Sequence, residues 1–260
     1  MSKLAAGWRI QRRVISALML RELVTRFGRE NIGFLWVMVE PLLFAVLVGI
    51  VWRFMKGPEE HGVGVIAFVA TGYIPLTLFR NVLGRSIRVF SVNASLMYHR
   101  QIKVLDFIFV RFLIEVIGTM MAYLFIAVTL MSFGEFPMPA DMGALLLGWL
   151  LYCWFTLALV LVLAPLSEKS DVLEKLVPIT TYIMIPFSGT FAMMSWLTPG
   201  AQSVLYYSPF VHGMELMRHG IFGGRVDAQW DVSVPIAASL VLTLIGLSMC
   251  RQIRRDLVVE

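Results

Sequence analysis

The sequence predicts an all-α polytopic membrane protein with six transmembrane helices and both termini in the cytoplasm. Hydrophobic residues make up 58% of the chain, charged residues 15%, and the mean hydropathy is +0.79. A globular domain cannot use so much apolar surface, because it must cover itself with polar groups. Five long intervals contain no Asp, Glu, Lys or Arg, and a sixth contains only Glu40. Since a helix needs about 20 apolar residues to cross the hydrocarbon core, these intervals define the spans.

The expected spans follow these intervals to within a few residues. They cover 33–54, 64–84, 105–133, 142–166, 176–195 and 233–251. The uncharged interval 176–214 is too long for one crossing and too short for two crossings with a loop. We therefore expect one span there, followed by re-entrant or interfacial helices in an external segment, 196–232, that is rich in Pro and Gly.

Residues 8–32 predict an amphipathic helix that lies along the cytoplasmic face of the membrane. One apolar stripe contains Ile10, Val14, Ile15 and Leu18, and a second contains Leu20, Leu23, Val24 and Phe27. The two stripes lie about half a turn apart, so a straight helix cannot bury both in one flat interface. We expect a bend near Leu20. The pattern leaves open whether the helix is only a membrane anchor or also a partner interface.

The distribution of basic residues sets the orientation. Residues 1–33, 85–104, 167–175 and 251–260 together hold 16 Lys and Arg, whereas the loops assigned to the outside hold four, Arg53, Lys56, Arg218 and Arg225. Basic flanks resist translocation, so the 16 are placed inside. The net charge of +5 is then a topological signal. Because the basic groups are divided among four segments next to the bilayer, nucleic acid is not an expected partner.

The usual enzymatic and cofactor motifs are missing from the sequence. It contains no phosphate loop, no H-E-x-x-H pair and no nucleophile elbow. His212 and Glu215 lack a third metal ligand and are interpreted as interfacial polar groups. Cys153 and Cys250 form no CxxC pair. We expect no catalytic residue, no metal and no cofactor on this chain, which is not an enzyme by itself.

One specific pattern surrounds the first span. Residues 21–29 read R-E-L-V-T-R-F-G-R, residues 33–36 read G-F-L-W, and residues 40–42 read E-P-L. This resembles the entry signature of type-2 ABC exporter permeases, and most closely that of the capsular-polysaccharide, KpsM-like branch. The resemblance extends over essentially the whole chain, including its length, its six expected spans and the basic second loop.

The resemblance implies a permease subunit that exports a lipid-linked capsular polysaccharide across the bacterial inner membrane. It implies a separate ABC ATPase dimer, which would carry ATP and Mg, and partners that reach through the periplasm toward the outer membrane. One six-helix subunit is small for a wide conduit, so a homodimer with the path between its subunits is expected. Three alternatives stay open: another lipid-linked cargo such as O-antigen or teichoic acid, a proton-coupled secondary transporter, and an intramembrane enzyme.

A conduit for a polymer must let sugars slip, and flat aromatic faces do this better than a dense set of fixed hydrogen bonds. The candidate path residues are Trp36, Glu40, Phe44, Tyr73, Phe79, Tyr182 and Phe187. Aromatic residues in spans also serve simple packing. The carboxylate of Glu40 is costly inside a membrane and indicates either a functional role or a pair with Arg80 or Arg111. Arg111 and Glu115, spaced i, i+4, are expected to pair with each other.

The basic loop 85–104 is the expected contact with the ATPase, as in the resembling exporters. The candidate coupling residues are Asn93, Leu96, Met97, Tyr98 and Arg100, and the candidate basic entrance for anionic cargo consists of Arg26, Arg29, Arg85 and Arg88. The alternatives are a solvated linker for the loop, and a purely topological role for the four arginines.

Overall fold

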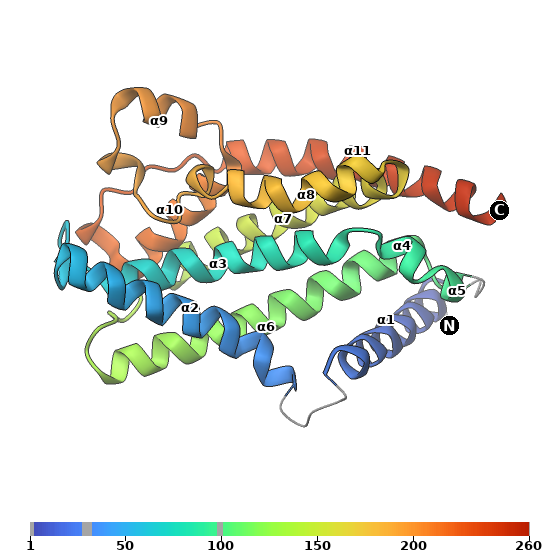
Figure 1. The fold of residues 1–260 in the computed structure, drawn as a ribbon, viewed down its shortest axis with the longest axis horizontal. Helices are drawn as coiled ribbons and strands as arrows, with labels where there is room; N and C mark the ends of the chain where they lie inside the picture. The colour runs from blue at the N-terminus through green and yellow to red at the C-terminus, as the bar shows by residue number, and fades with distance from the viewer. Residues whose placement is uncertain (1–2, 28–32, 98–100, 260) are drawn as a thin grey trace.

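The computed structural model describes the backbone of residues 3–27, 33–97 and 101–259 (Figure 1). Its α-helices are α1 (Lys3–Phe27), α2 (Gly33–Lys56), α3 (Val65–Ser86), α4 (Val89–Val92), α5 (Ala94–Met97), α6 (Val104–Ser132), α7 (Met142–Lys169), α8 (Asp171–Ile183), α9 (Pro199–Leu205), α10 (Pro209–Phe222) and α11 (Ser233–Val259). Short 3-10 turns are η1 (Pro186–Ser188), η2 (Met194–Trp196) and η3 (Gly223–Arg225), and β1 (Glu59–Glu60) pairs with β2 (Val63–Gly64) as an antiparallel hairpin.

The long helices run between two ends of the molecule (Figure 1). Helices α1, α4 and α5 and the last turns of α11 lie at one end, which we name the proximal end. The β-hairpin, α9 and α10 lie at the other, which we name the distal end. Helix α7 is central, because it packs against α11, α10, α3 and α8.

Among the described residues, four helices are long and apolar enough to cross a membrane. They are Val65–Ser86, Val104–Ser132, Met142–Lys169 and Ser233–Ile253. They coincide with the spans expected at 64–84, 105–133, 142–166 and 233–251. Helix α2 occupies the position of the span expected at 33–54, but several of its side chains, including those of Trp36 and Glu40, lie outside the described residues.

Close helix packing depends on small residues. A Cβ added to Gly148 of α7 would lie 2.7 Å from the carbonyl oxygen of Gly213 in α10, and one added to Gly246 of α11 would lie 2.5 Å from the Cβ of Leu161 in α7. Since lipid supplies no hydrophobic drive between membrane helices, such close backbone approaches supply much of the van der Waals contact that holds them together.

The N-terminal helix α1 continues without interruption through Leu20, near which the sequence predicts a bend. Val14, Ile15 and Leu18, from the first predicted stripe, pack against the core, whereas Leu20 and Val24, from the second, are exposed. Ile10 of the first stripe is also exposed, and Leu23 of the second also packs against the core, so each stripe is divided between the protein and the surface.

The fifth expected span, 176–195, is the clearest correction. Helix α8 begins earlier, at Asp171, and ends at Ile183, and the chain continues through η1 and a non-helical segment to η2. Its 13 residues reach only about 20 Å at 1.5 Å per residue, less than the roughly 30 Å of hydrocarbon. Pro186 has no N–H group with which to continue the helical hydrogen bonds, and Gly189 adopts a left-handed φ of 70°. An absence of charge does not distinguish such a broken segment from a helix.

Two buried charged residues of α10 hold this broken segment. Arg218 is fully buried and donates to the carbonyl oxygens of Gly189 (2.6 Å), Thr190 and Ala192 (3.4 Å), with its guanidinium carbon 3.8 Å from the ring centre of Phe68. Glu215 accepts hydrogen bonds from the backbone N–H groups of Met194 (2.9 Å) and Gln229 (3.0 Å). We name these two residues the distal clamp.

The interpretation of His212 and Glu215 as interfacial polar groups is therefore wrong, and the burial of Arg218 was not predicted. Arg218 and Glu215 lie inside the protein, and so does His212, which contacts the carbonyl oxygen of Tyr206 (2.7 Å) and accepts from the backbone N–H of Asp231 (3.0 Å). Irregular backbone leaves N–H and C=O groups without helical partners, and these side chains satisfy them.

Candidate functional site

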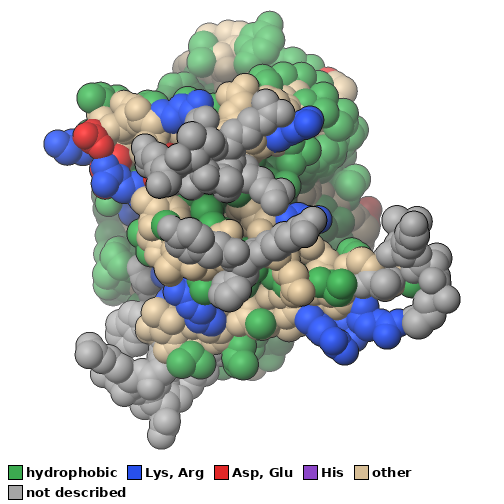
Figure 2. Space-filling model, turned by 90° about the vertical axis from the view of Figure 1, so that its right-hand side faces the viewer, with side chains coloured by type: hydrophobic (Ala, Val, Ile, Leu, Met, Phe, Trp, Pro, Cys, Tyr) green, Lys and Arg blue, Asp and Glu red, His purple; other side chains and the backbone are tan. Residues whose placement is uncertain are grey.

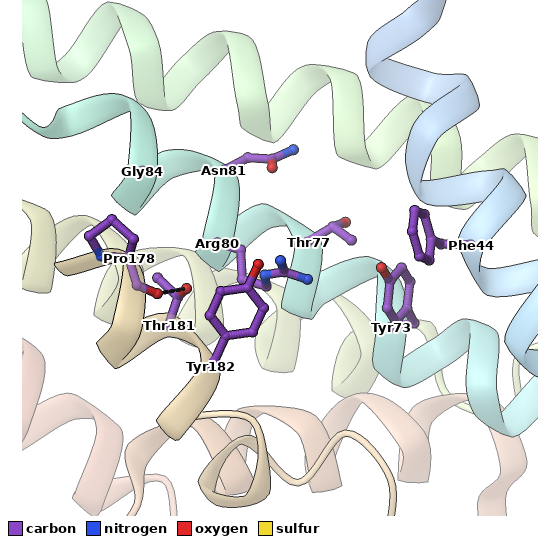
Figure 3. A pocket seen from close by; sticks show the side chains of 9 residues that line it. All are labelled: Phe44, Tyr73, Thr77, Arg80, Asn81, Gly84, Pro178, Thr181 and Tyr182. Carbon is purple, nitrogen blue, oxygen red and sulfur yellow. Dashed lines mark hydrogen bonds between the residues drawn. The ribbon is translucent and has the colours of Figure 1, made fainter. Parts of the chain in front are cut away.

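A cavity of about 280 Å³ lies between α2, α3 and α8 (Figure 3). Its wall is made mostly by one face of α3, with residues spaced three or four apart. The lining residues are Phe44, Tyr73, Thr77, Arg80, Asn81, Gly84, Pro178, Thr181 and Tyr182. Among the described residues, no group of His, Cys, Asp or Glu is placed to hold a metal ion.

Aromatic rings stand on two sides of the cavity (Figure 3). The rings of Phe44 and Tyr73 stack across α2 and α3, with centroids 5.9 Å apart and planes inclined by 17°. Tyr182 projects from α8 on the other side. Phe44 is 51% exposed and Tyr182 is 60% exposed, so both present open faces. Such faces suit contact with the C–H faces of a sugar.

The polar part of the lining holds one cation and no described carboxylate. The guanidinium carbon of Arg80 lies 4.8 Å from the ring centre of Tyr182. Thr77 and Thr181 donate their hydroxyl hydrogens to the carbonyl oxygens of Ile74 (2.7 Å) and Pro178 (2.6 Å) within their own helices. Both hydroxyls therefore retain acceptor capacity.

The structure brings together three of the seven candidate path residues, Phe44, Tyr73 and Tyr182. Phe79 lies on another face of α3, where it is buried with its ring 4.7 Å from that of Phe210. Phe187 lies in η1 and does not line the cavity. The side chains of Trp36 and Glu40 lie outside the described residues.

The polar lining of the cavity was not predicted, although a signal for it is present in the sequence. Tyr73, Thr77, Arg80 and Gly84 recur at helical spacing along α3. Such a stripe of tyrosine, hydroxyl, charge and glycine within a span indicates a face that avoids lipid. Asn81 and Thr181 complete it.

At the proximal end, a network of ion pairs joins α1, α3 and α6. Glu115 of α6, whose side chain is fully buried, binds Arg26 of α1 at 2.7 Å and Arg85 of α3 at 3.0 Å. Arg111 of α6 binds Glu22 of α1 at 3.2 Å. We name these five residues the proximal network. The expected pair between Arg111 and Glu115 is therefore wrong, because α1 supplies a better-placed partner for each.

The candidate basic entrance is thus largely paired within the chain. Arg26 and Arg85 belong to the proximal network, and Arg88 binds Asp171 (2.5 Å) and Glu174 (2.8 Å) at the start of α8. Arg29 lies outside the described residues. Figure 2, which views the proximal end, shows Lys and Arg side chains around this face with few acids beside them.

The loop 85–104 forms two short helices, α4 and α5, at the proximal end. Asn93 between them is buried, donating to the carbonyl oxygen of Val89 (2.8 Å) and accepting from Arg21 of α1 (2.9 Å). Leu96 and Met97 pack partly against the core, while Val92 is 68% exposed. Tyr98 and Arg100 lie outside the described residues.

A further anchor of this loop was not predicted. The carboxylate of Glu168 in α7 accepts hydrogen bonds from the backbone N–H groups of Phe90 (2.9 Å) and Ser91 (3.2 Å) in α4. The N–H groups of a first helical turn have no helical partner, and Glu168 satisfies two of them. The loop is thus fixed to α1 at one point and to α7 at another.

Comparison with known proteins places this arrangement in a family. Residues 13–222 match the family of ABC-2 type transporters. The chain belongs to the ABC-2 type transporter family. The capsule polysaccharide export inner-membrane protein CtrC of Neisseria meningitidis is 40% identical over 240 residues, 92% of this chain and 91% of that protein. The corresponding protein BexB of Haemophilus influenzae is 38% identical over 248 residues, 95% and 94% of the two chains.

A more distant relative covers the same extent. The polysialic acid transport protein KpsM of Escherichia coli is 24% identical over 246 residues, 95% of each chain. The resemblance to type-2 exporter permeases, and to their capsular-polysaccharide branch, is therefore confirmed. In this ABC-2 chain, the cavity between α2, α3 and α8 combines exposed aromatic faces with polar groups of the candidate span α3.

Proposed function

We propose that the chain is the membrane-spanning permease subunit of an ATP-driven exporter that moves a lipid-linked capsular polysaccharide across the bacterial inner membrane. The observation that carries this proposal is the similarity of more than nine-tenths of the chain to proteins named for capsule polysaccharide export. The lining of the cavity supports it, because stacked and exposed rings beside hydroxyl and amide groups suit a carbohydrate.

In this proposal two copies of the chain form the conduit. Helices α2 and α8, which contribute to the cavity, also carry apolar side chains that are exposed in the single chain, among them Leu43, Leu47, Ile179 and Ile183. A second copy packed on this side would cover those side chains and close the cavity from lipid. Phe44 and Tyr182 would then face the polymer from each subunit.

ATP hydrolysis is assigned to a separate ATPase dimer that binds the proximal end. This end would be cytoplasmic, and the distal end would face the periplasm and its export partners. Helices α4 and α5 suit the ATPase contact, because they project at the proximal end while Asn93 and Glu168 tie them to α1 and α7. Reporter fusions at residue 260 and within 134–141 test this orientation by reading inside and outside respectively.

Reconstitution tests the proposed function. The chain and its cognate ATPase in inverted vesicles should transfer lipid-linked polymer into the lumen only when ATP is supplied. Tyr73→Ala removes a ring from the cavity and should reduce transfer severalfold, whereas Leu124→Ala, at an exposed position of α6, should leave it unchanged. Transfer without ATP, or nucleotide bound to the purified chain alone, would contradict the proposal.

A second experiment tests the ATPase contact. Val92→Asp places a charge on the exposed face of α4 and should weaken co-purification of the ATPase, because a buried charge at an interface is costly. Val204→Asp makes the same exchange at an exposed position of α9 at the distal end. Equal retention of the ATPase by both variants would show that α4 is not part of the contact.

A further inference from the structure

Arg80 differs from the other arginines that the structure describes within the predicted spans. Arg111 is paired with Glu22, and in the neighbouring distal segment Arg218 is bonded to backbone carbonyls. Arg80 lies on the cavity wall against the ring of Tyr182, and no carboxylate among the described side chains forms an ion pair with it. It is a cation held in position by an aromatic face.

The position of Arg80 makes this arrangement costly without a ligand. It precedes the end of α3 by six residues, which is about 9 Å at 1.5 Å per residue. A cation within a membrane helix is rare and marks an ion or substrate pathway by default. The described neighbours Thr77, Asn81 and Thr181 are neutral, so they can solvate an anion beside the guanidinium but cannot neutralise the cation themselves.

We infer that Arg80 selects anionic cargo by binding the carboxylates of the polysaccharide repeat as they pass. This inference rests on the proposed function and names the substrate class, an acidic polysaccharide. A guanidinium binds a carboxylate through two parallel hydrogen bonds, and its planar face remains free to stack on Tyr182. One partly exposed cation per subunit binds each repeat weakly enough to release it, which suits transport of a polymer.

The contrast with the expected basic entrance strengthens this assignment. The described members of that entrance, Arg26, Arg85 and Arg88, are bonded to carboxylates of the chain. They would have to give up these partners to bind an anion. Arg80 would give up none among the described side chains, so it is the better-placed group for recognition of cargo charge.

The test compares two probes that differ only in charge. Fluorescently labelled oligogalacturonate carries one carboxylate per repeat, and reduction of its carboxylates to hydroxymethyl groups gives a neutral oligomer of the same backbone. Both lack a lipid anchor, so an anchor phosphate cannot contribute. Binding is measured on the complex of the full chain with its ATPase in nanodiscs, together with vesicle export of the native polymer.

The wild-type complex should bind the acidic probe more tightly than the neutral one. Arg80→Gln should weaken binding of the acidic probe about tenfold, as expected for loss of a charge-assisted hydrogen bond, and leave the neutral probe unchanged. Arg80→Lys should keep part of the preference. Arg53→Gln, at an exposed ion pair of the distal end, should alter neither affinity.

Two results would overturn the inference. If Arg80→Gln lowered the affinity for both probes equally, Arg80 would only hold helices together, for example through Glu40. Equal affinity of the wild-type complex for the two probes, or none for either, would show that the cavity does not select charge. Failure of the wild-type complex to export native polymer with ATP would instead contradict the proposed function, whatever Arg80 does.

Discussion

The proximal network and the distal clamp bind different kinds of partner. At the proximal end, the side chains of Glu115 and Glu22 pair with arginines of neighbouring continuous helices. At the distal end, Arg218 and Glu215 bond to main-chain groups of broken segments. A helix satisfies its own backbone, so only side chains remain to join it to others, whereas irregular backbone inside a membrane protein needs partners from elsewhere.

The distal clamp and the proximal network therefore have different structural roles. The distal clamp fixes the course of a chain segment that has no regular structure of its own. The proximal network fixes the positions of three helices that form without it. Loss of the clamp should therefore cost more stability than loss of the network, and the following predictions test this order.

The largest effect is expected for Arg218→Met. This change leaves the carbonyl oxygens of Gly189 and Thr190 buried without their donor, and each such orphaned group costs about 1–3 kcal/mol, so roughly 3 kcal/mol or more is expected in total. Thermal unfolding in detergent measures the loss. The matched exchange Arg225→Met, at an exposed position of the same end, should be nearly neutral, and equal losses would show that Arg218 is no clamp.

A smaller loss is expected for Gly72→Ala, next to the clamp. The added Cβ would lie 2.6 Å from Nη2 of Arg218 and would also contact the carbonyl oxygen of Thr190, and such overpacking typically costs about 1–3 kcal/mol. Gly84→Ala, in the same helix but with no atom near the added Cβ, should instead stabilise α3 by up to about 1 kcal/mol. The melting temperature should fall for Gly72→Ala and rise for Gly84→Ala. A change in the same direction for both variants would contradict the close approach of Arg218 and Thr190 to Gly72.

The proximal counterpart is Glu115→Gln, which keeps the shape of the side chain and removes its charge. Arg85 loses its partner and Arg26 keeps only Glu22, at 2.8 Å, but a charge no longer has to be desolvated at position 115, so a loss of about 1–2 kcal/mol is expected. A double-mutant cycle with Arg26→Gln should show coupling between the two positions, because they are in direct contact. Strict additivity of the two losses would show that the pair contributes nothing.

The same contrast explains what the sequence predicted and what it did not. Span positions follow from lengths of uncharged sequence, and four of the predicted spans match helices long and apolar enough to cross a membrane. The break after Ile183 leaves the sequence equally uncharged, so hydropathy could not locate it. Arg218 was assigned to an external loop, but it is fully buried and binds the backbone of the broken segment. No sequence pattern predicts these partners, because they are backbone carbonyl groups.

The candidate site shows the same limit at the level of single residues. Tyr73 and Arg80 are seven residues apart and share a face, whereas Phe79 is six residues from Tyr73 and turns away. Helical spacing alone could therefore have shown that Phe79 does not share the face of Tyr73 and Arg80. The partners of Arg111 and Glu115 were beyond such local rules, because the competing groups, Glu22 and Arg26, come from a helix far away in the sequence.

The smallest effect is expected for Lys56→Ala at the distal surface. Lys56 binds Glu60 at 2.8 Å and lies 4.1 Å from the ring centre of Trp52, but it is exposed to solvent. Water screens such pairs, so the loss should be at most about 0.5–1 kcal/mol and should shrink further in high salt. The loss in Glu115→Gln should persist in the same salt, since its pair is buried. A salt-independent loss in Lys56→Ala as large as that of Glu115→Gln would show that burial does not set the order.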